Sequence, residues 1–173
     1  SYEALKEINP KIIVGAVSGF GSSGPYAQRP CFDTIAQALS GALSYTGFPE
    51  NPPTRSGVAW VDFSSGAHLA VGVMFALYHR QKTGKGQAMD ISMMDSLFSL
   101  LFDEALDVYV ERGIPIRTGN RRLRLTPFNS YKAKDGYVVI CTGADVHWDN
   151  LLKAMGREDL IGDTRYKTLD QRM

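Results

Sequence analysis

The chain has 173 residues, 44% of them hydrophobic, and its 19 basic and 18 acidic side chains give a net charge of +1. This hydrophobic content is enough for the core of one ordinary domain. A charge so close to neutral argues against binding to nucleic acid or to an anionic membrane surface. No run of about 18 apolar residues occurs, so no membrane-spanning helix is expected. Two distant cysteines, Cys31 and Cys141, are typical of free thiols in a reducing compartment.

The first half of the chain has the order of elements of an α/β protein. A helix is predicted over Tyr2–Ile8, and Ile12–Val17 is an apolar run of strand length, typical of a buried strand in a parallel sheet. After a loop rich in Gly, Ser and Pro, a short helix is expected over Phe32–Leu43. A long apolar helix then runs from about Ala67 and ends at Gly84, because basic residues followed by glycine are helix stop signals.

The second half changes character after another long helix. A short strand at Gln87–Ile91 precedes this helix, which is predicted over Met94–Arg112 from its separate apolar and acidic faces. Residues 114–129 hold prolines and arginines without helical or strand periodicity, as in a crossing linker. A hairpin is expected over residues 130–142 because its centre is Asp-Gly. A helix at residues 147–155 follows.

Two kinds of site are not expected from the motifs. Gly19–Gly24 fits the pattern G-x-G-x-x-G after a predicted strand, but Pro25 follows at once, where dinucleotide binding requires a helix to begin. The three histidines, His68, His79 and His147, lack cysteine, histidine or carboxylate partners at the spacing of metal ligands. The sequence therefore predicts neither a nicotinamide or flavin site nor a metal site.

Asp62 is the candidate functional residue with the most informative position. It lies in Gly57–Gly66, immediately before the long apolar helix, where aspartate is a preferred N-cap. The unpaired amides at the start of a helix also favour an ionised carboxylate, so the same position suits a charged, oriented nucleophile. The residue pattern alone leaves both interpretations open.

A set of segments spread along the chain resembles the family III CoA-transferases, the CaiB/BaiF family. The resemblance lies in the order and spacing of these segments, since none is specific alone. They are Asn9–Ile13, Ser18–Tyr26, Phe32–Gly41, Thr46-Gly47, the Asp62 segment, Arg80–Gln87, Met89–Asp95 and Tyr131–Tyr137. Members of the family are much longer, so the chain is interpreted as a central fragment.

The resemblance implies a fold and an assembly. Residues 1–112 are expected to be the C-terminal part of the family's parallel-sheet α/β large domain, residues 113–129 a linker, and residues 130–173 the start of a smaller α+β domain. Full-length members are interlaced homodimers, so a homodimer is expected here. A cytoplasmic location is expected, with the mitochondrial matrix or the peroxisome as the eukaryotic equivalents.

The resemblance also implies an activity. In this family the aspartate at the position of Asp62 is the nucleophile that moves CoA from an acyl-CoA to a free carboxylic acid. The route passes through an aspartyl anhydride and an aspartyl-CoA thioester, so no ATP is needed and no phosphate-binding loop is present. No cofactor is expected to be permanently bound, because the CoA thioester is a substrate. The expected partners are therefore an acyl-CoA and a small carboxylic acid.

Supporting roles are implied for a few further residues. Asp33 matches an acidic position near the nucleophile, although an N-cap of the following helix is an equally available role. Met93 matches a position along the pantetheine channel, but methionine is common in cores. Arg121 and Arg122 are candidates to bind CoA phosphates or the acceptor carboxylate, or belong to a solvated linker.

Two alternative functions remain on the same scaffold. The α-methylacyl-CoA racemases use a histidine immediately before the acidic residue matched by Asp33, and here that place is Phe32, which cannot transfer a proton. Transfer is therefore favoured over racemisation. The other alternative is a non-catalytic unit for binding or dimer formation, against which the intact Asp62 and Asp33 argue. The sequence does not identify the donor acyl-CoA or the acceptor acid.

Overall fold

The computed structural model describes residues 1–103 and 106–172, which form two compact units. Each unit is described by itself. The first comprises Ser1–Thr46 and Pro53–Ile116, and the second comprises Gly47–Pro52 and Arg117–Met173. The domain limits expected from the sequence for the complete protein stay a prediction.

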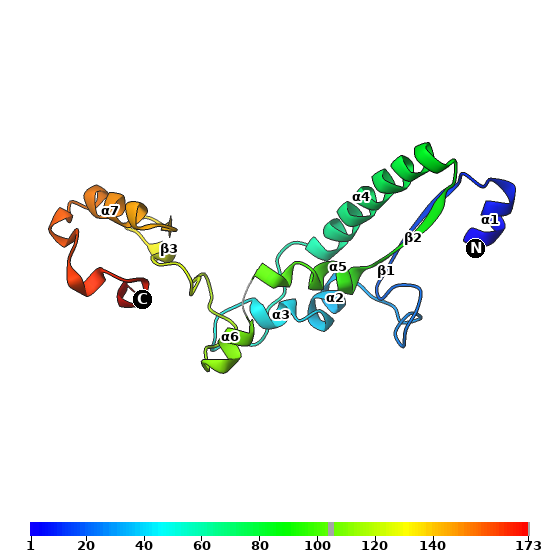
Figure 1. The fold of residues 1–173 in the computed structure, drawn as a ribbon. Helices are drawn as coiled ribbons and strands as arrows, with labels where there is room; N and C mark the ends of the chain where they lie inside the picture. The colour runs from blue at the N-terminus through cyan, green and yellow to red at the C-terminus, as the bar shows by residue number, and fades with distance from the viewer. Residues whose placement is uncertain (104–105, 173) are drawn as a thin grey trace. The chain divides into compact units, whose positions relative to one another are not determined.

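The first unit is built around a parallel pair of strands, as predicted. Strand β1 (Ile13–Ser18) pairs with β2 (Gln87–Ser92) in a register that joins Ile13 to Gln87 and Ser18 to Ser92. Helix α4 (Trp60–Thr83) precedes β2 and packs against both strands (Figure 1). A Cβ atom on Gly15 would lie 2.6 Å from the Leu69 side chain, so glycine permits the close approach of α4 to the sheet.

Helix α4 begins earlier than its apolar pattern predicts. Its first residue is Trp60 and its N-cap is Ala59, whose side chain makes no capping hydrogen bond. Asp62 therefore lies inside the first turn, and the interpretation of Asp62 as the N-cap is wrong. The predicted end at Gly84 is confirmed, because Gly84 adopts a left-handed conformation with φ of 73°.

The helix expected over Phe32–Leu43 is two shorter helices. Helix α2 spans Asp33–Leu39 and helix α3 spans Ala42–Tyr45. The break lies at Gly41, whose φ of 94° is available to glycine at little cost. Phe32 is the N-cap of α2, so the N-cap role considered for Asp33 is also wrong.

The long helix predicted over Met94–Arg112 is interrupted. Helix α5 spans Met93–Phe98, a 3-10 turn η1 spans Leu101–Asp103, and helix α6 spans Leu106–Glu111, with residues 104–105 of the prediction outside the described residues. Helix α1 (Tyr2–Ile8) is confirmed, and Ser1 Oγ caps it by accepting a bond from the Ala4 amide at 3.5 Å.

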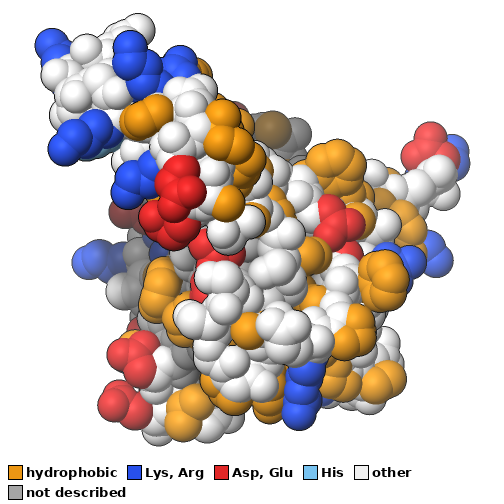
Figure 2. All heavy atoms as spheres, turned by 90° about the vertical axis from the view of Figure 1, so that its right-hand side faces the viewer, with side chains coloured by type: hydrophobic (Ala, Val, Ile, Leu, Met, Phe, Trp, Pro, Cys, Tyr) orange, Lys and Arg blue, Asp and Glu red, His pale blue; other side chains and the backbone are white. Residues whose placement is uncertain are grey.

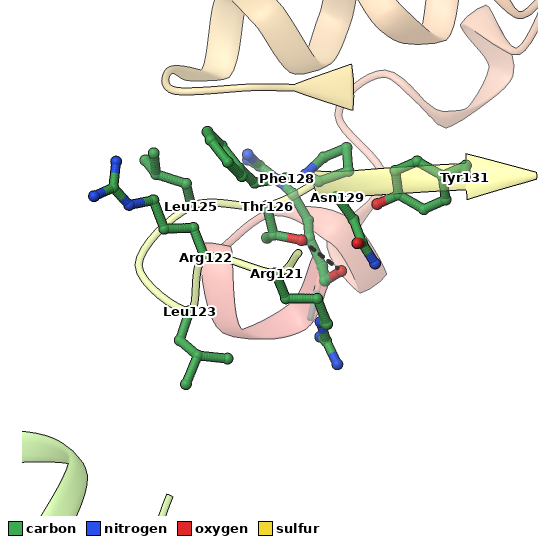
Figure 3. A pocket seen from close by; sticks show the side chains of 10 residues that line it. Arg121, Arg122, Leu123, Leu125, Thr126, Phe128, Asn129 and Tyr131 are labelled. Atoms are coloured by element: carbon green, nitrogen blue, oxygen red, sulfur yellow. Dashed lines mark hydrogen bonds between the residues drawn. The ribbon is translucent and has the colours of Figure 1, made fainter. Parts of the chain in front are cut away.

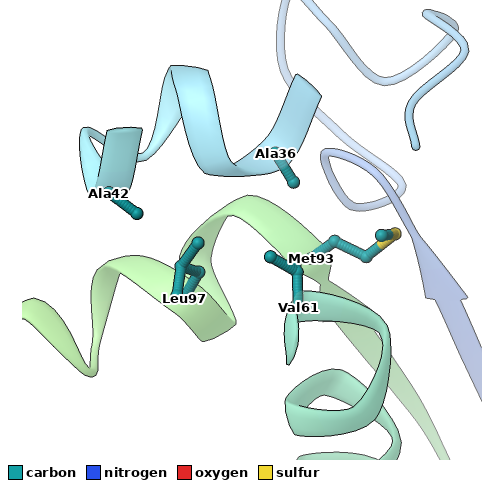
Figure 4. Close-up of a cluster of buried hydrophobic side chains, with 5 residues drawn as sticks. All are labelled: Ala36, Ala42, Val61, Met93 and Leu97. Carbon is teal, nitrogen blue, oxygen red and sulfur yellow. The ribbon is translucent and has the colours of Figure 1, made fainter. Parts of the chain in front are cut away.

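The core of the first unit lies where four helices meet. Figure 4 shows the side chains of α2, α3, α4 and α5 converging on a shared interior. Because α5 follows β2 directly, this core adjoins the carboxyl ends of the parallel strands. In open α/β sheets that edge is the usual place of a binding site. The cluster consists of Ala36, Ala42, Val61, Met93 and Leu97.

In its described residues, which end at 172, the second unit contains the predicted hairpin and four short helical segments. Strand β3 (Phe128–Lys132) pairs antiparallel with β4 (Tyr137–Cys141), so the hairpin begins two residues before its predicted start at 130. Arg172 bonds Asp145 at 2.6 Å and lies 5.4 Å from the centre of the Trp148 ring. The helical segments are α7 (Asp145–Ala154), η2 (Glu158–Leu160), η3 (Thr164–Tyr166) and α8 (Leu169–Arg172).

Hydrophobic side chains are frequent at the surface. Figure 2 shows them between charged groups on the face turned toward the viewer. On α4, Phe63 is 73% exposed and Phe75 is 70% exposed. By length and composition this helix could also cross a membrane, contrary to the sequence expectation. Only 17% of its apolar window is buried in this structure, although α4 packs on β1 and β2.

Candidate active site

The first turn of α4 presents Asp62 to solvent. The side chain is exposed, and within residues 1–103 and 106–172 its carboxylate takes part in no hydrogen bond or ion pair. Helix α4 is 24 residues long, so its aligned peptide dipoles favour a negative charge in this turn. An exposed and unbonded carboxylate at such a place is accessible to an electrophile.

Asp33, in the first turn of α2, has the opposite environment. It is only 9% exposed, and both of its carboxylate oxygens accept hydrogen bonds. Oδ1 accepts from the Val61 amide at 3.0 Å, and Oδ2 accepts from Nε2 of Gln37 at 2.6 Å. Val61 immediately precedes Asp62 in the chain. Asp33 thus satisfies an amide at the start of α4 that the side chain of Ala59 leaves without a cap.

Gln37 is a site residue that the sequence analysis missed. Its side chain is 1% exposed, and its Oε1 accepts a bond from the Ser56 amide at 2.9 Å. It thereby joins α2 to the loop that leads into α4. The spacing of four residues between Asp33 and Gln37, which places both on one side of a helix, was the available signal.

Cys31 lies close to both aspartates. Burial raises the pKa of its thiol, a bond from the backbone of Ala36 lowers it, and the negative charges of Asp62 and Asp33 raise it further. A Cβ atom on Gly19 would lie 2.1 Å from the Cys31 Cβ, so only glycine allows this contact after β1. The segment of residues 19–31 is therefore brought to the start of α2.

The glycine-rich segment after β1 is tied to the sheet by Asp90. Asp90 Oδ2 accepts a bond from the Ser22 amide at 2.7 Å, and the bonds from Ser22 lower the pKa of the Asp90 carboxyl. This anchor gives the segment a structural role. That the glycine pattern is not a dinucleotide-binding turn stays a prediction.

The other candidates in the first unit differ in accessibility. Phe32 is 77% exposed and stands beside Asp33 at the start of α2. Met93 is 9% exposed and packs with Val61 and Leu97 in the core (Figure 4). Its role along a pantetheine channel stays a prediction.

Arg121 and Arg122 belong to the second unit. They line a pocket of about 270 Å³ together with Thr126, Asn129 and Arg172 (Figure 3). Thr126 Oγ1 donates to the Arg172 carbonyl at 3.3 Å across this pocket. Their role toward CoA or an acceptor acid stays a prediction.

The described part of the chain, residues 1–103 and 106–172, holds no group of three or more histidine, cysteine or acidic side chains placed to bind a metal ion.

Comparison with known proteins identifies the class of this α/β chain. The profile of CoA-transferase family III matches residues 1–173. The chain is 41% identical over 175 aligned residues to an acetyl-CoA:oxalate CoA-transferase of Acetobacter aceti. The alignment covers 100% of this chain and 45% of that protein. It is 40% identical to a succinyl-CoA:mesaconate CoA-transferase of Haloarcula hispanica, in an alignment that covers 94% of this chain and 42% of that protein.

A solved structure agrees with these sequences. The crystal structure of a CaiB/BaiF family protein from Brucella suis superposes with a TM-score of 0.79 at 35% identity, over 99% of this chain and 46% of that one. The chain therefore belongs to CoA-transferase family III, as its motifs suggest. It spans less than half the length of the curated relatives that it matches.

Proposed function

We propose that this chain is the nucleophile-bearing part of a CoA-transferase that moves CoA from an acyl-CoA to a free carboxylic acid, with Asp62 as the nucleophile. The observation that carries this proposal is the exposed and unbonded carboxylate of Asp62 in the first turn of α4. Membership of CoA-transferase family III supports it. Asp33, buried and twice bonded, is poorly placed to attack a substrate.

The reaction begins with attack of an Asp62 carboxylate oxygen on the thioester carbonyl of the donor. The carbon–sulfur bond breaks, CoA leaves as a thiolate, and a mixed anhydride remains on Asp62. The thiolate then attacks the aspartyl carbonyl of this anhydride and expels the donor acid as a carboxylate. The product is an aspartyl-CoA thioester, and no proton is gained or lost.

The second half of the reaction reverses these steps with the acceptor. The acceptor carboxylate attacks the aspartyl thioester, releases the CoA thiolate and forms a second anhydride. The thiolate attacks the acceptor acyl carbon, which releases the new acyl-CoA and regenerates the Asp62 carboxylate. Each step exchanges one activated acyl group for another, so ATP is not required. Water must be excluded, since hydrolysis would consume the activated intermediates.

The proposed substrates are an acyl-CoA donor and a small carboxylic acid acceptor. Oxalate and mesaconate, in the names of two relatives, are dicarboxylic acids. Arg121 and Arg122 are proposed to bind anionic groups of CoA or of the acceptor, because guanidinium groups pair well with phosphates and carboxylates. The complete protein is proposed to act as a cytoplasmic homodimer without a permanently bound cofactor.

The nucleophile is tested by Asp62→Asn in the full-length protein. The amide keeps the size of the side chain but is a poor nucleophile, so kcat for CoA transfer should fall by at least roughly 10³-fold. Asp170→Asn is the matched control, because Asp170 is also exposed in the first turn of a helix. Transfer by Asp62→Asn at a rate near that of the control would show that the covalent mechanism is wrong.

Racemisation is separated from transfer by a second measurement. The full-length enzyme is incubated with a chiral 2-methylacyl-CoA in deuterated water, with and without a carboxylic acid. Phe32 offers no second base, so the α-proton should not exchange while the CoA ester of the added acid forms. Exchange of that proton in the absence of any acceptor would instead support the racemase alternative.

A further inference from the structure

We propose that Gln37 is a positioning residue for the reaction, and that it acts through Asp33 on the helix that carries Asp62. Gln37, Asp33 and the amides of Ser56 and Val61 form a hydrogen-bonded set that we name the Asp33–Gln37 clamp. This inference rests on the proposed function of Asp62, because a clamp on α4 affects catalysis only if α4 carries the nucleophile.

The clamp joins two segments that are distant in the sequence, helix α2 and residues 56–61. One bond connects Ser56 to Gln37, 19 residues away, and another connects Val61 to Asp33, 28 residues away. The chain between Ser56 and Val61 leads into α4 and is thus held at both ends by α2. Ala59, the N-cap residue between them, contributes no side-chain bond, so α2 supplies the cap that α4 lacks.

The direction of the bonds explains why glutamine is suited to this place. Its Nε2 donates to Asp33 Oδ2 at 2.6 Å while its Oε1 accepts from the Ser56 amide at 2.9 Å. Because Oδ2 of Asp33 is held toward Gln37, Oδ1 is directed to the Val61 amide and accepts its bond at 3.0 Å. Gln37 is 1% exposed, so water has little access to replace either bond.

The consequence for catalysis is a fixed position of Asp62. Its carboxylate has no hydrogen bond of its own in the described residues, so its place is set by the backbone of the first turn of α4. Loosening that turn misplaces the attacking oxygen. Because a displacement of about 1 Å can reduce a rate about 100-fold, kcat should fall more than the KM for the acyl-CoA changes.

The test exchanges the two side-chain types. In the double variant Asp33→Asn with Gln37→Glu, the introduced asparagine still accepts from the Val61 amide, its Nδ2 donates to the introduced glutamate, and that glutamate accepts from the Ser56 amide. All bonds and the total charge are kept. Each single substitution instead breaks the set. Asp33→Asn places two amide donors opposite each other, and Gln37→Glu places two carboxylates opposite each other. Gln81→Glu, an exposed glutamine near the other end of α4, is the matched control.

We expect each single variant of the full-length enzyme to lose roughly 10- to 100-fold in kcat with little change in KM. The double variant should recover to within about threefold of the Gln81→Glu control, because it restores the geometry. A folded double variant that stays as slow as the single variants would overturn the proposal, since the charge of Asp33 would then matter and not its position. A single variant with unchanged kcat would also overturn it.

A measurement on the unmodified enzyme does not depend on whether variants fold. The clamp requires the amides of Ser56 and Val61 to be protected from hydrogen–deuterium exchange, although side chains are their acceptors. Rapid exchange at either amide would overturn the proposal. Failure of the proposed function is distinct, because it would appear as absent CoA transfer in an enzyme whose two amides remain protected.

Discussion

The first turns of α2 and α4 each carry an aspartate, and the two carboxylates have opposite surroundings. Asp33 is 9% exposed and accepts two hydrogen bonds, whereas Asp62 is exposed and accepts none from the described residues. Both are acidic residues at helix starts, which the sequence alone treats alike. The difference indicates that Asp33 stabilises the site and Asp62 is available to react.

The same comparison shows how the carboxylate of Asp62 is kept accessible. If Asp62 had been the N-cap of α4, its oxygens would be occupied by helix amides. Asp33 supplies that bond from another helix, so Asp62 is free of it.

Stability should respond to Asp33 far more than to Asp62. Asp33→Ala leaves the Val61 amide and the Gln37 side chain without their partner in a buried place, and should lower the free energy of unfolding by about 2–4 kcal/mol. Asp62→Ala removes only an exposed charge near a helix start and should cost about 0.3–1 kcal/mol. Denaturant unfolding of both full-length variants measures the difference, and equal losses would refute this assignment of roles.

Gly66 offers a way to stabilise α4 without touching the clamp. A Cβ atom there meets no atom within 4 Å, and its φ is not positive. Gly66→Ala should therefore raise the free energy of unfolding by about 0.5–1 kcal/mol, because alanine loses less entropy in a helix. The melting temperature checks this. Gly72→Ala is the contrasting variant, since its Cβ would lie 3.2 Å from Met89 Sδ and should give no such gain.

The anchor between Asp90 and Ser22 should depend on pH. The bonds from Ser22 lower the pKa of Asp90 below its ordinary value of 3.8, so their contribution is fully present above that value. It is lost as the pH falls through the lowered pKa. Since Asp90 is exposed, the contribution should be roughly 0.2–1 kcal/mol. Unfolding of the wild type and of Asp90→Asn should differ at pH 6 and converge at the acid end.

The thiol of Cys31 should report the charge of Asp62. That charge is one of the causes that raise the pKa of Cys31, so Asp62→Asn should increase the thiolate fraction. Alkylation of Cys31 at pH 8 should become about two- to threefold faster, in line with a screened interaction between charges. Cys141, in the second unit, is the internal control. An unchanged rate at Cys31 would show that the two groups are not close.

Local patterns predicted the elements whose signals lie within them. The apolar run of β1, the glycine end of α4 and the Asp-Gly turn of the hairpin all have local causes, and all were found in the structure. The start of α4 was placed too late because its cap, Asp33, lies 28 residues away from the amide that it satisfies. Within the local sequence, Asp62 was therefore the candidate cap.

The helix predicted over Met94–Arg112 failed for a different reason. Its apolar face was expected to pack along its whole length, but only its ends are covered: Leu97 is 0% and Tyr109 9% exposed, whereas Leu100 between them is 44% exposed. An amphipathic stripe stabilises a helix only where a surface covers it. Of the site, Asp62 and Asp33 were predicted from the family resemblance. Gln37 was missed because its partners are a side chain and a backbone amide that only the tertiary structure brings together.

The most direct test of the account is chemical trapping of the acyl group on Asp62. The full-length enzyme is mixed with an acyl-CoA and a carboxylic acid, quenched with hydroxylamine during turnover, and digested for mass spectrometry. Hydroxylamine nitrogen attacks the aspartyl carbonyl, CoA leaves as the thiol, and a stable hydroxamate remains. The account predicts this modification on Asp62, without modification of Asp33. An unmodified Asp62 during active turnover, or a hydroxamate on Asp33, would contradict it.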